Sequence, residues 1–211
     1  MARSRASDYD DKRRAILNRS AELFSAYGYD RASMNRIAEA CGVSKANLYH
    51  YYKDKEELLF DVIRYHLEDL LEVVDGANRR ELAPQARLRE LVGALLEAYR
   101  DADSQHNVQL NSMRFLPAER QSELKGMERE LVKIFSDAVS GVAPQLIGSE
   151  LLKPVTMSLF GMINWHYLWF KSNGSVSRAD YADLVTRLIT DGTSDLLTQP
   201  QPATKRVTVA K

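Results

Sequence analysis

The sequence predicts an all-α protein of about nine helices, in which a small N-terminal helical domain precedes a larger one. Apolar residues recur at the 3.6-residue spacing of amphipathic helices along almost the whole chain. Runs of alternating β-branched residues between turns, which are typical of strands, are absent. With 45% hydrophobic and 27% charged residues, the 211-residue chain can bury a core and keep a polar surface.

Three short helices are predicted in the first 51 residues. The first covers residues 11–27 and ends at Gly28, because glycine readily takes the left-handed conformation that closes a helix. The second follows Ser33, whose hydroxyl can accept from the free amides at a helix start, and it ends at Gly42. The third is capped by Ser44 and runs to about residue 51.

Longer helices follow. Asp54 with Glu57 three residues later predicts a capping box at the start of a helix over residues 54–75. Ser177 with Asp180 predicts a similar cap on the last helix. The strongly apolar residues 155–170 are too few, and too often interrupted by polar residues, to span a bilayer. The expected helices beyond residue 75 cover residues 85–101, 104–115, 118–140, 149–171 and 178–197.

The charge is distributed unevenly although the net charge is zero. Residues 1–55 carry 11 basic and 7 acidic side chains, residues 56–198 carry 15 and 22, and residues 199–211 carry three basic ones. A basic N-terminal part attracts phosphate, whereas an acidic body does not. The charge pattern therefore favours a nucleic-acid-binding domain over residues 1–54, followed by a second domain over 55–198 and a disordered basic tail over 199–211.

The second and third predicted helices, joined by a tight turn, have the layout of a helix-turn-helix DNA reader. A recognition helix presents short polar side chains at its N-terminal end, where they reach base edges in the major groove. Lys45 can donate to guanine or phosphate, Asn47 can pair with an adenine edge, and Ala46 leaves room for a thymine methyl. The flat side chains that follow suit phosphate oxygens. The candidate DNA contacts are Ser33, Arg36, Ser44, Lys45, Ala46, Asn47, Tyr49, His50, Tyr51 and Lys55.

Residues 11–60 resemble the N-terminal domain of the TetR family of bacterial transcriptional repressors. The matching residues are Phe24, Gly28, Ser33, Ile37, Ala38, Gly42, Val43, Leu48, Tyr49, Tyr52, Lys53 and Lys55 to Leu58. The resemblance implies a fold of nine or so helices and a homodimer that binds a palindromic operator, from which a small effector releases it. Asn47 departs from the pattern, because a small residue is frequent at its position in the family.

The resemblance also implies that residues 1–54 are the DNA-binding domain and residues 55–198 the ligand-binding and dimerisation domain. In that larger domain an effector binds, and the last two long helices form the dimer. Methionine and aromatic side chains line adaptable apolar cavities, although they also fill ordinary cores. The candidate pocket residues are Met113, Arg114, Phe115, Met127, Phe135, Met162, Trp165, His166, Trp169 and Phe170. The candidate dimer residues, which could instead fill the core of one subunit, are Leu151, Val155, Leu159, Leu184, Val185, Leu188 and Ile189.

Two classes of effector remain open. Residues 161–171 are similar to a segment of TetR-family members that sense acyl-CoA thioesters, and such a ligand needs an apolar tunnel with cations at its mouth. A sensor of multiple drugs or other lipophilic compounds, regulating an efflux gene, would use carboxylates and aromatic faces for cationic ligands. We expect the acyl-CoA class, with no cofactor other than the effector.

Other functions are disfavoured by the residues. The four histidines lack metal-ligand spacing, and no phosphate loop or nucleophile elbow is present, so we expect neither a metal site nor catalytic residues. A purely structural helical module would not require the polar and aromatic side chains between Ser44 and Lys55. Because Cys41 is the single cysteine and no secretory signal is found, we expect a cytoplasmic protein with no membrane contact.

Overall fold

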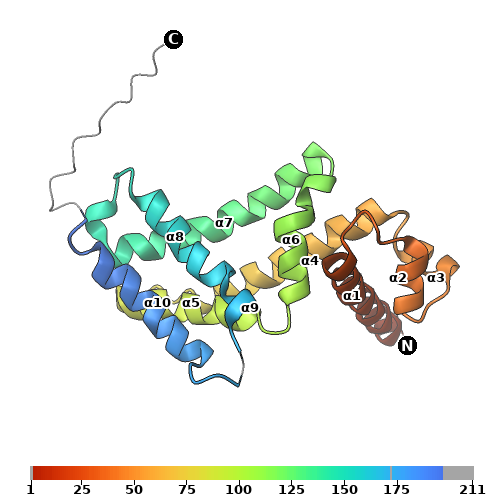
Figure 1. The fold of residues 1–211 in the computed structure, drawn as a ribbon, viewed down its shortest axis with the longest axis horizontal. Coiled ribbons are helices and arrows are strands. Elements are labelled where there is room, and N and C mark those ends of the chain that lie inside the picture. The colour runs from red at the N-terminus through yellow and green to blue at the C-terminus, as the bar shows by residue number, and fades with distance from the viewer. Residues whose placement is uncertain (1, 172, 197–211) are drawn as a thin grey trace, which may run out of the picture. The chain divides into compact units, whose positions relative to one another are not determined.

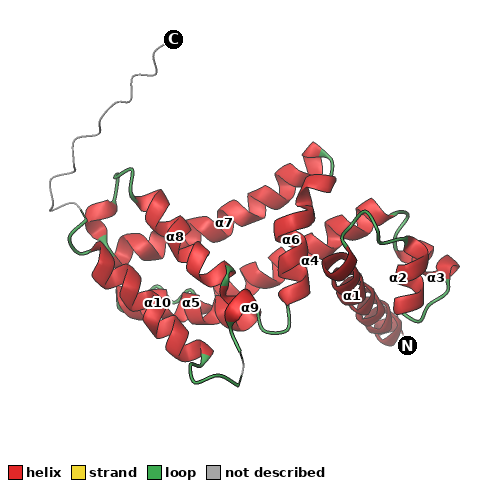
Figure 2. Cartoon of the chain, viewed as in Figure 1, coloured by secondary structure: helices red, strands yellow, loops and turns green. Residues whose placement is uncertain are grey.

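The computed structural model describes residues 2–171 and 173–196, and every regular element in this part of the chain is a helix (Figures 1 and 2). This confirms the predicted all-α fold. In chain order the elements are α1 (Ala2–Tyr27), α2 (Met34–Ala40), α3 (Lys45–Tyr51), α4 (Lys55–Ala77), α5 (Pro84–Ala98), α6 (Asp103–Ser112), η1 (Met113–Phe115), α7 (Ala118–Val142), η2 (Pro144–Leu146), α8 (Leu152–Asn164), α9 (His166–Trp169) and α10 (Arg178–Thr193). The basic tail predicted for residues 199–211 lies outside the described residues.

The N-terminal helices begin and end for the reasons that the sequence indicates. Gly28 and Gly42 have φ angles of +81° and +64°, in the left-handed region that glycine tolerates. The hydroxyl of Ser33 accepts a hydrogen bond from the backbone N–H of Arg36, and that of Ser44 accepts one from Asn47 at 3.1 Å. These caps satisfy amides that a helix start leaves free.

The cap of α4 differs by one residue from the prediction. The carboxylate of Asp54 accepts from the backbone N–H of Glu57 at 2.8 Å, as expected. The carboxylate of Glu57, however, accepts from the N–H of Lys53 at 3.0 Å and not from that of Asp54. The predicted box at α10 is complete, because Ser177 and Asp180 each cap the backbone of the other.

Several helix boundaries differ from the prediction. α5 ends at Ala98 and not at residue 101, and α10 ends at Thr193 and not at residue 197. The first helix starts at Ala2 and not near residue 11, because no glycine or proline interrupts the residues between them. The single helix predicted over residues 149–171 is divided into α8 and α9 at Trp165, which has φ and ψ angles of −88° and −2°. Four aromatic residues and a histidine occupy positions 165–170, and such side chains lose much of their rotational freedom in a helix.

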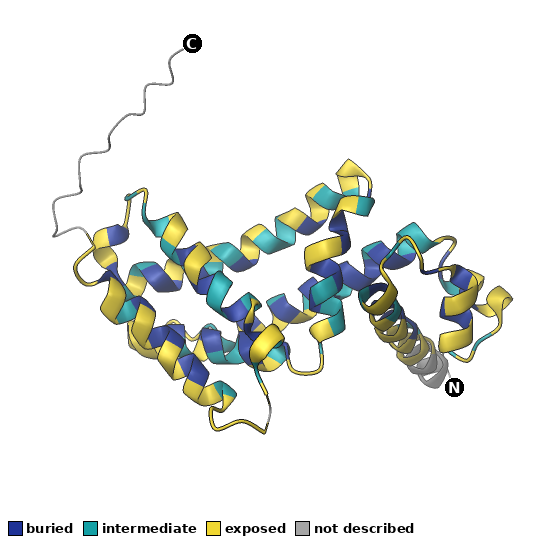
Figure 3. Ribbon diagram, in the orientation of Figure 1, coloured by how far each residue is buried: buried dark blue, intermediate teal, exposed yellow. Residues whose placement is uncertain are grey.

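The described residues form two compact units. Unit 1 lies within residues 1–77 and 94–131, and unit 2 lies within residues 78–93 and 132–211. In unit 1, α1, α4 and α6 pack against one another, and α2 packs against both α1 and α3. Figure 3 shows the buried stripe along α4. None of the described helices is long and apolar enough to cross a membrane.

Unit 2 has an aromatic core beside α8 and α10, which contact each other. The rings of Phe135 and Phe160 meet edge to face, with centroids 5.0 Å apart. The hydroxyl of Tyr181 donates to the backbone carbonyl of Met162 at 3.0 Å. The ring of His166 packs between those of Phe170 and Tyr181, and burial, with the nearby charge of Arg178, lowers its pKa to about 4.

Unit 1 contains a buried polar cluster around His66. The rings of Tyr99 and His106 are 4.4 Å apart, and that of His106 lies 6.0 Å from His66. The Nε2 atom of His66 is buried without a hydrogen-bond partner, and Gln109 next along the cluster donates to Glu128 at 2.9 Å. Burial, together with His106, lowers the pKa of His66 to about 3, so His66 is neutral at pH 7.

The pKa of His66 makes the stability of unit 1 depend on pH. The unfolded chain protonates this histidine near pH 6.5, whereas in the folded chain it stays neutral down to about pH 3. The neutral His66 therefore contributes its full share of the unfolding free energy above pH 6.5, and this share is lost as the pH falls towards 3. Replacing His66 by leucine should therefore reduce the loss of unfolding free energy between pH 7.5 and 5 by about 2 kcal/mol.

Urea unfolding of the wild type and of His66→Leu at both pH values tests this expectation. The exposed His50 supplies the control, because His50→Leu should leave the difference between the two pH values unchanged. An equal loss of stability in His66→Leu and the wild type would show that His66 is not the group responsible.

Candidate nucleic-acid interface

The recognition helix α3 has one buried face and one exposed face. Leu48 is fully buried and Tyr52, at its C-terminal end, is 1% exposed. These two side chains anchor the helix in the core of unit 1. The side chains of Lys45, Ala46 and Asn47 are exposed at the N-terminal end, which is where a recognition helix meets base edges.

Lys45 and Tyr49 lie one turn apart on this exposed face. The Nζ atom of Lys45 is 5.8 Å from the ring centroid of Tyr49, and Tyr49 is 43% exposed. A cation and a phenol on one helical turn can contact a base and a phosphate of the same strand. The geometry is therefore suited to the roles predicted for these two residues.

The remaining aromatic side chains of α3 divide between solvent and packing. His50 is exposed, and its ring meets that of Tyr51 edge to face at 5.8 Å. Tyr51 is half-buried and stacks on Tyr9 of α1, with centroids 4.8 Å apart. Tyr51 therefore also joins α3 to α1.

Ser33 and Arg36 lie at the start of α2, beside α3. Ser33 is exposed and caps the helix, while the guanidinium of Arg36 lies 4.4 Å from the ring centroid of Tyr27. Arg36 is itself exposed, so its charge stays accessible to a phosphate. Ser44, also exposed, combines the cap of α3 with a position at the edge of the predicted interface.

Lys55 has a different environment from the one expected for a phosphate contact. Its ammonium donates to the carbonyls of Tyr29 and Ala32 at 2.8 and 2.9 Å, and lies 4.2 Å from the Tyr29 ring centroid. These bonds close the loop between α1 and α2, whose carbonyls need donors. The structure thus gives Lys55 a role in holding the loop, and its contact with DNA stays a prediction.

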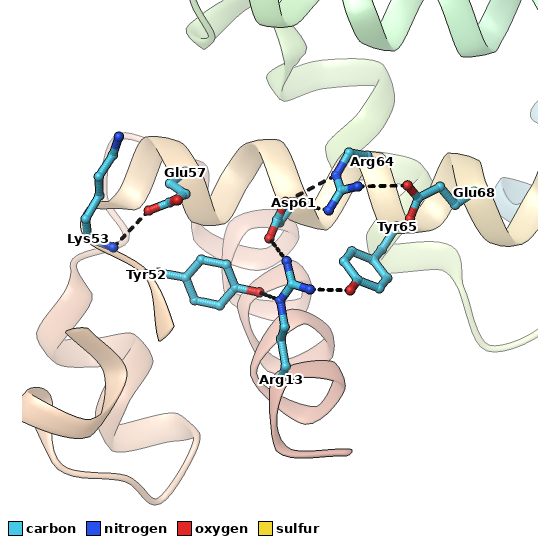
Figure 4. A network of polar contacts seen from close by, with 8 residues as sticks. All are labelled: Arg13, Tyr52, Lys53, Glu57, Asp61, Arg64, Tyr65 and Glu68. Carbon is cyan, nitrogen blue, oxygen red and sulfur yellow. Dashed lines mark hydrogen bonds and ion pairs between the residues drawn. The ribbon is translucent and has the colours of Figure 1, made fainter. Parts of the chain in front are cut away.

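Behind α3 lies a polar network that the sequence analysis did not find (Figure 4). The guanidinium of Arg13, on α1, donates to the hydroxyls of Tyr52 and Tyr65 and to the carboxylate of Asp61. Asp61 and Tyr65 lie on α4. A basic residue three positions before the buried Ile16 was the available signal, because it places a charge on the apolar face of α1.

The comparisons with known proteins agree with this geometry. Residues 16–62 match the model described as "Bacterial regulatory proteins, tetR family", and residues 81–193 match "Tetracyclin repressor-like, C-terminal domain". The chain belongs to the TetR family. It is therefore a DNA-binding transcriptional regulator and not an enzyme.

Three relatives illustrate the likeness. A TetR-family regulator from Bordetella parapertussis is 35% identical, with a TM-score of 0.80 over 89% of this chain and 98% of that one. AibR, solved in complex with isovaleryl coenzyme A and operator DNA, is 29% identical, with a TM-score of 0.72 over 84% and 97%. The regulator RutR of Escherichia coli K12 is 38% identical over 90 residues, which span 43% of this chain and 42% of RutR.

The effector residues predicted from the TetR resemblance are distributed over both units. Met113, Arg114, Phe115 and Met127 belong to unit 1, and the other six belong to unit 2. Phe115 stacks on Tyr29 of the loop after α1, with centroids 5.0 Å apart, and so it contacts the DNA-binding part directly. Trp165 and Trp169 are 57% and 52% exposed, so neither is enclosed within the chain.

Polar groups suited to orienting an effector occur where the sequence analysis did not place them. The cluster of His66, Tyr99, His106 and Gln109 is buried inside unit 1. A cavity of about 390 Å³ lies next to it, between α1, α4 and the start of α6. It is lined by Arg14, Leu17, Asn18, Val62, Tyr65, His66, Asp69, Leu70, Glu72, Val73, Ala98, Ala102 and Gln105. Histidines spaced along different helices gave no sequence motif, so only the fold brings them together.

The predicted dimer residues also separate by burial. Leu159, Val185 and Ile189 are 5% exposed or less, and fill the core of unit 2. Leu151 and Val155 are half-buried. Leu184 and Leu188, one turn apart on α10, are 49% and 53% exposed, and Met157 on α8 is 47% exposed. The exposed members are the ones that a partner subunit can cover.

The different environments of Lys45 and Lys55 predict different effects of removing each charge. Lys45→Gln should weaken operator binding and reduce the slope of log affinity against log salt by about 1, since one phosphate or base contact is lost. Lys55→Gln should lower the free energy of unfolding by about 1–3 kcal/mol, because three carbonyls lose a charged donor.

Fluorescence anisotropy with a labelled duplex between 50 and 300 mM salt, paired with urea unfolding, separates the two effects. Lys133→Gln, an exposed lysine of unit 2, is the matched control. A Lys45→Gln variant that keeps both the affinity and the salt slope of the wild type would contradict the assignment of Lys45 to the interface.

Proposed function

We propose that this TetR-family protein is a repressor that binds a palindromic operator as a homodimer and is released by a small apolar effector, an acyl-CoA thioester of a catabolic pathway. The observation that carries the proposal is α3: its polar N-terminal face is exposed, while Leu48 and Tyr52 fix the opposite face in the core. Such a helix can enter a major groove without rearrangement of unit 1.

The homodimer is supported by the exposed face of α10. Leu184 and Leu188 repeat at a spacing of four residues, and α8, which contacts α10, exposes Met157. Apolar side chains at this spacing form the seam of a helix bundle between two copies of a chain. A two-fold dimer holds two recognition helices at the separation that a palindrome requires.

Placing a charge in this seam should separate the subunits. Leu188→Asp should convert the protein from a dimer to a monomer of 24.0 kDa and abolish tight operator binding, because one recognition helix alone makes half of the contacts. Leu110→Asp is the matched control, since Leu110 is 44% exposed and lies in unit 1.

Light scattering on the purified variants gives the mass directly. A dimer that persists in Leu188→Asp, or that dissociates equally in Leu110→Asp, would contradict a seam on α10.

The acyl-CoA effector is supported by the likeness to AibR, which was solved with isovaleryl coenzyme A. An acyl-CoA also needs cations for its phosphates, and Arg114, Lys125 and Arg129 on and near α7 have no carboxylate partner among the ion pairs of the described residues. The neutral His66 and the buried Gln109 offer hydrogen bonds to an uncharged polar group such as an amide or thioester.

A sensor of lipophilic cations is the second candidate, and the cavity of unit 1 favours it. Asp69, Glu72 and the ring of Tyr65 line that cavity beside a single cation, Arg14. Burial, together with Glu72, raises the pKa of Asp69, so an approaching organic cation would stabilise its carboxylate. Carboxylates and aromatic faces are the groups that bind such cations.

Release of a labelled operator distinguishes the two effector classes. Isovaleryl-CoA should lower operator affinity at least tenfold at saturation, whereas free coenzyme A, which lacks the acyl chain, should have little effect. Tetraphenylphosphonium represents the lipophilic cations. Release by the phosphonium but by no acyl-CoA of short or medium chain would overturn the acyl-CoA assignment and support the second candidate.

A further inference from the structure

Arg13 occupies the point where three elements of unit 1 meet. Its Nε atom donates to the hydroxyl of Tyr52 at 3.2 Å, Nη1 donates to the hydroxyl of Tyr65, and Nη2 donates to the carboxylate of Asp61. Figure 4 shows the guanidinium between these partners. Tyr52 is the C-cap residue of the recognition helix α3, and Asp61 and Tyr65 lie one turn apart on α4. One side chain of α1 thus joins the end of α3 to α4.

The partners of Arg13 are held in place from their own side. Asp61 also accepts from Arg64 at 3.2 Å, and Arg64 in turn donates to Glu68 at 2.9 Å. Tyr52 is 1% exposed, and burial raises the pKa of its phenol, so it stays a neutral hydroxyl. The carboxylate therefore keeps a fixed position on α4, and the phenol keeps a fixed position on α3.

We call the contacts of Arg13 with Tyr52, Asp61 and Tyr65 the Arg13 joint. The planar guanidinium suits it because its N–H donors point in fixed, diverging directions. A lysine ammonium concentrates its donors on one atom and cannot span three partners that come from two helices. The side chain of Arg13 is 25% exposed and that of Asp61 is 9% exposed, so solvent weakens these bonds little. Without the guanidinium, the buried carboxylate of Asp61 would lose one of its two cations, and the buried phenol oxygen of Tyr52 would lose the N–H that donates to it.

We propose that Arg13 is a positioning residue for DNA binding, which sets the orientation of α3 relative to α4. This inference rests on the DNA-binding function proposed above and names a residue that orients the recognition helix. We assign no DNA contact to Arg13, because each of its three guanidinium nitrogen atoms already donates to a protein group. A displacement of α4 that carries Asp61 and Tyr65 would pull the guanidinium away from Tyr52.

Three roles for Arg13 predict three different results. A phosphate contact would make its loss reduce the salt dependence of binding. A purely structural role would lower the free energy of unfolding and leave the operator affinity of the folded protein unchanged. A positioning role lowers the affinity of the folded protein at an unchanged salt slope, because the number of phosphate contacts stays the same while their geometry worsens.

The test uses the full-length chain with Tyr65→Phe, Arg13→Lys, their double variant, the charge-removing Arg13→Gln, and Arg19→Lys as control. Tyr65→Phe keeps the ring and removes only the hydroxyl, so it tests the contact even if the Arg13 variants fold poorly. Arg19 is an exposed arginine of the same helix and pairs with Glu22. Operator affinity is measured by anisotropy at several salt concentrations, and urea unfolding fixes the folded fraction of each variant.

We expect Tyr65→Phe and Arg13→Lys each to lower operator affinity about tenfold, the lower range for one hydrogen bond to a charged group. The salt slope should stay at the wild-type value. The double variant should lose no more operator affinity than the single variant that binds more weakly, because both changes break the same set of hydrogen bonds. Arg19→Lys should bind like the wild type.

An unchanged affinity in both Tyr65→Phe and Arg13→Lys, or a salt slope reduced by about 1 in Arg13→Gln, which removes the charge, would overturn the positioning role. Additive losses in the double variant would also overturn it. A wild-type chain that binds no duplex from its own genomic neighbourhood would overturn the proposed function, whereas tight wild-type binding that the variants do not alter overturns this inference alone.

Discussion

The hydrogen-bonded guanidinium of Arg13 is the interaction on which the arrangement of the DNA-binding unit depends. The apolar core, with Leu48 and Ile37 fully buried, holds α2 and α3 against α1, but contacts between apolar side chains have no preferred direction. Charge-assisted bonds to Tyr52, Tyr65 and Asp61 do have one. They select a single orientation of α3, and a recognition helix reads bases only in that orientation.

This arrangement provides a physical route from an effector to the operator. An effector changes DNA affinity only by binding one arrangement of α4 more tightly than another, and operator DNA changes effector affinity by the same factor. Both the cavity of unit 1 and the buried cluster around His66 use side chains of α4, as does the joint at Arg13. Phe115 of η1, which follows α6, stacks on Tyr29 and so contacts the loop before α2.

The helices of the DNA-binding part could be predicted closely because local chemistry decides them. Ser33, Ser44, Gly28 and Gly42 cap or end helices through their own backbone and side chains, and the structure places each as predicted. The break at Trp165 could not be predicted from periodicity, since the apolar pattern continues across it. It depends on how a crowded run of aromatic rings packs in unit 2.

The site was harder to predict where it depends on residues distant in the sequence. The exposed polar face of α3 follows from one short segment, so Lys45, Asn47 and Tyr49 could be named. Arg13 and Asp61 are 48 residues apart, and His66 and His106 belong to different helices, so neither pair forms a motif. For Lys55 the sequence predicted an exposed charge that contacts DNA. In the structure its ammonium donates instead to the loop carbonyls of Tyr29 and Ala32.

The central claim is that two copies of α3 enter successive major grooves on one face of a duplex. Methylation interference at guanine N7, which lies in the major groove, tests this most directly on a duplex from the protein's own genomic neighbourhood. We predict two blocks of interference related by a two-fold axis, with centres about 34–36 Å apart or a multiple of that spacing. A single block of interference, or no interference at any guanine N7, would contradict the account.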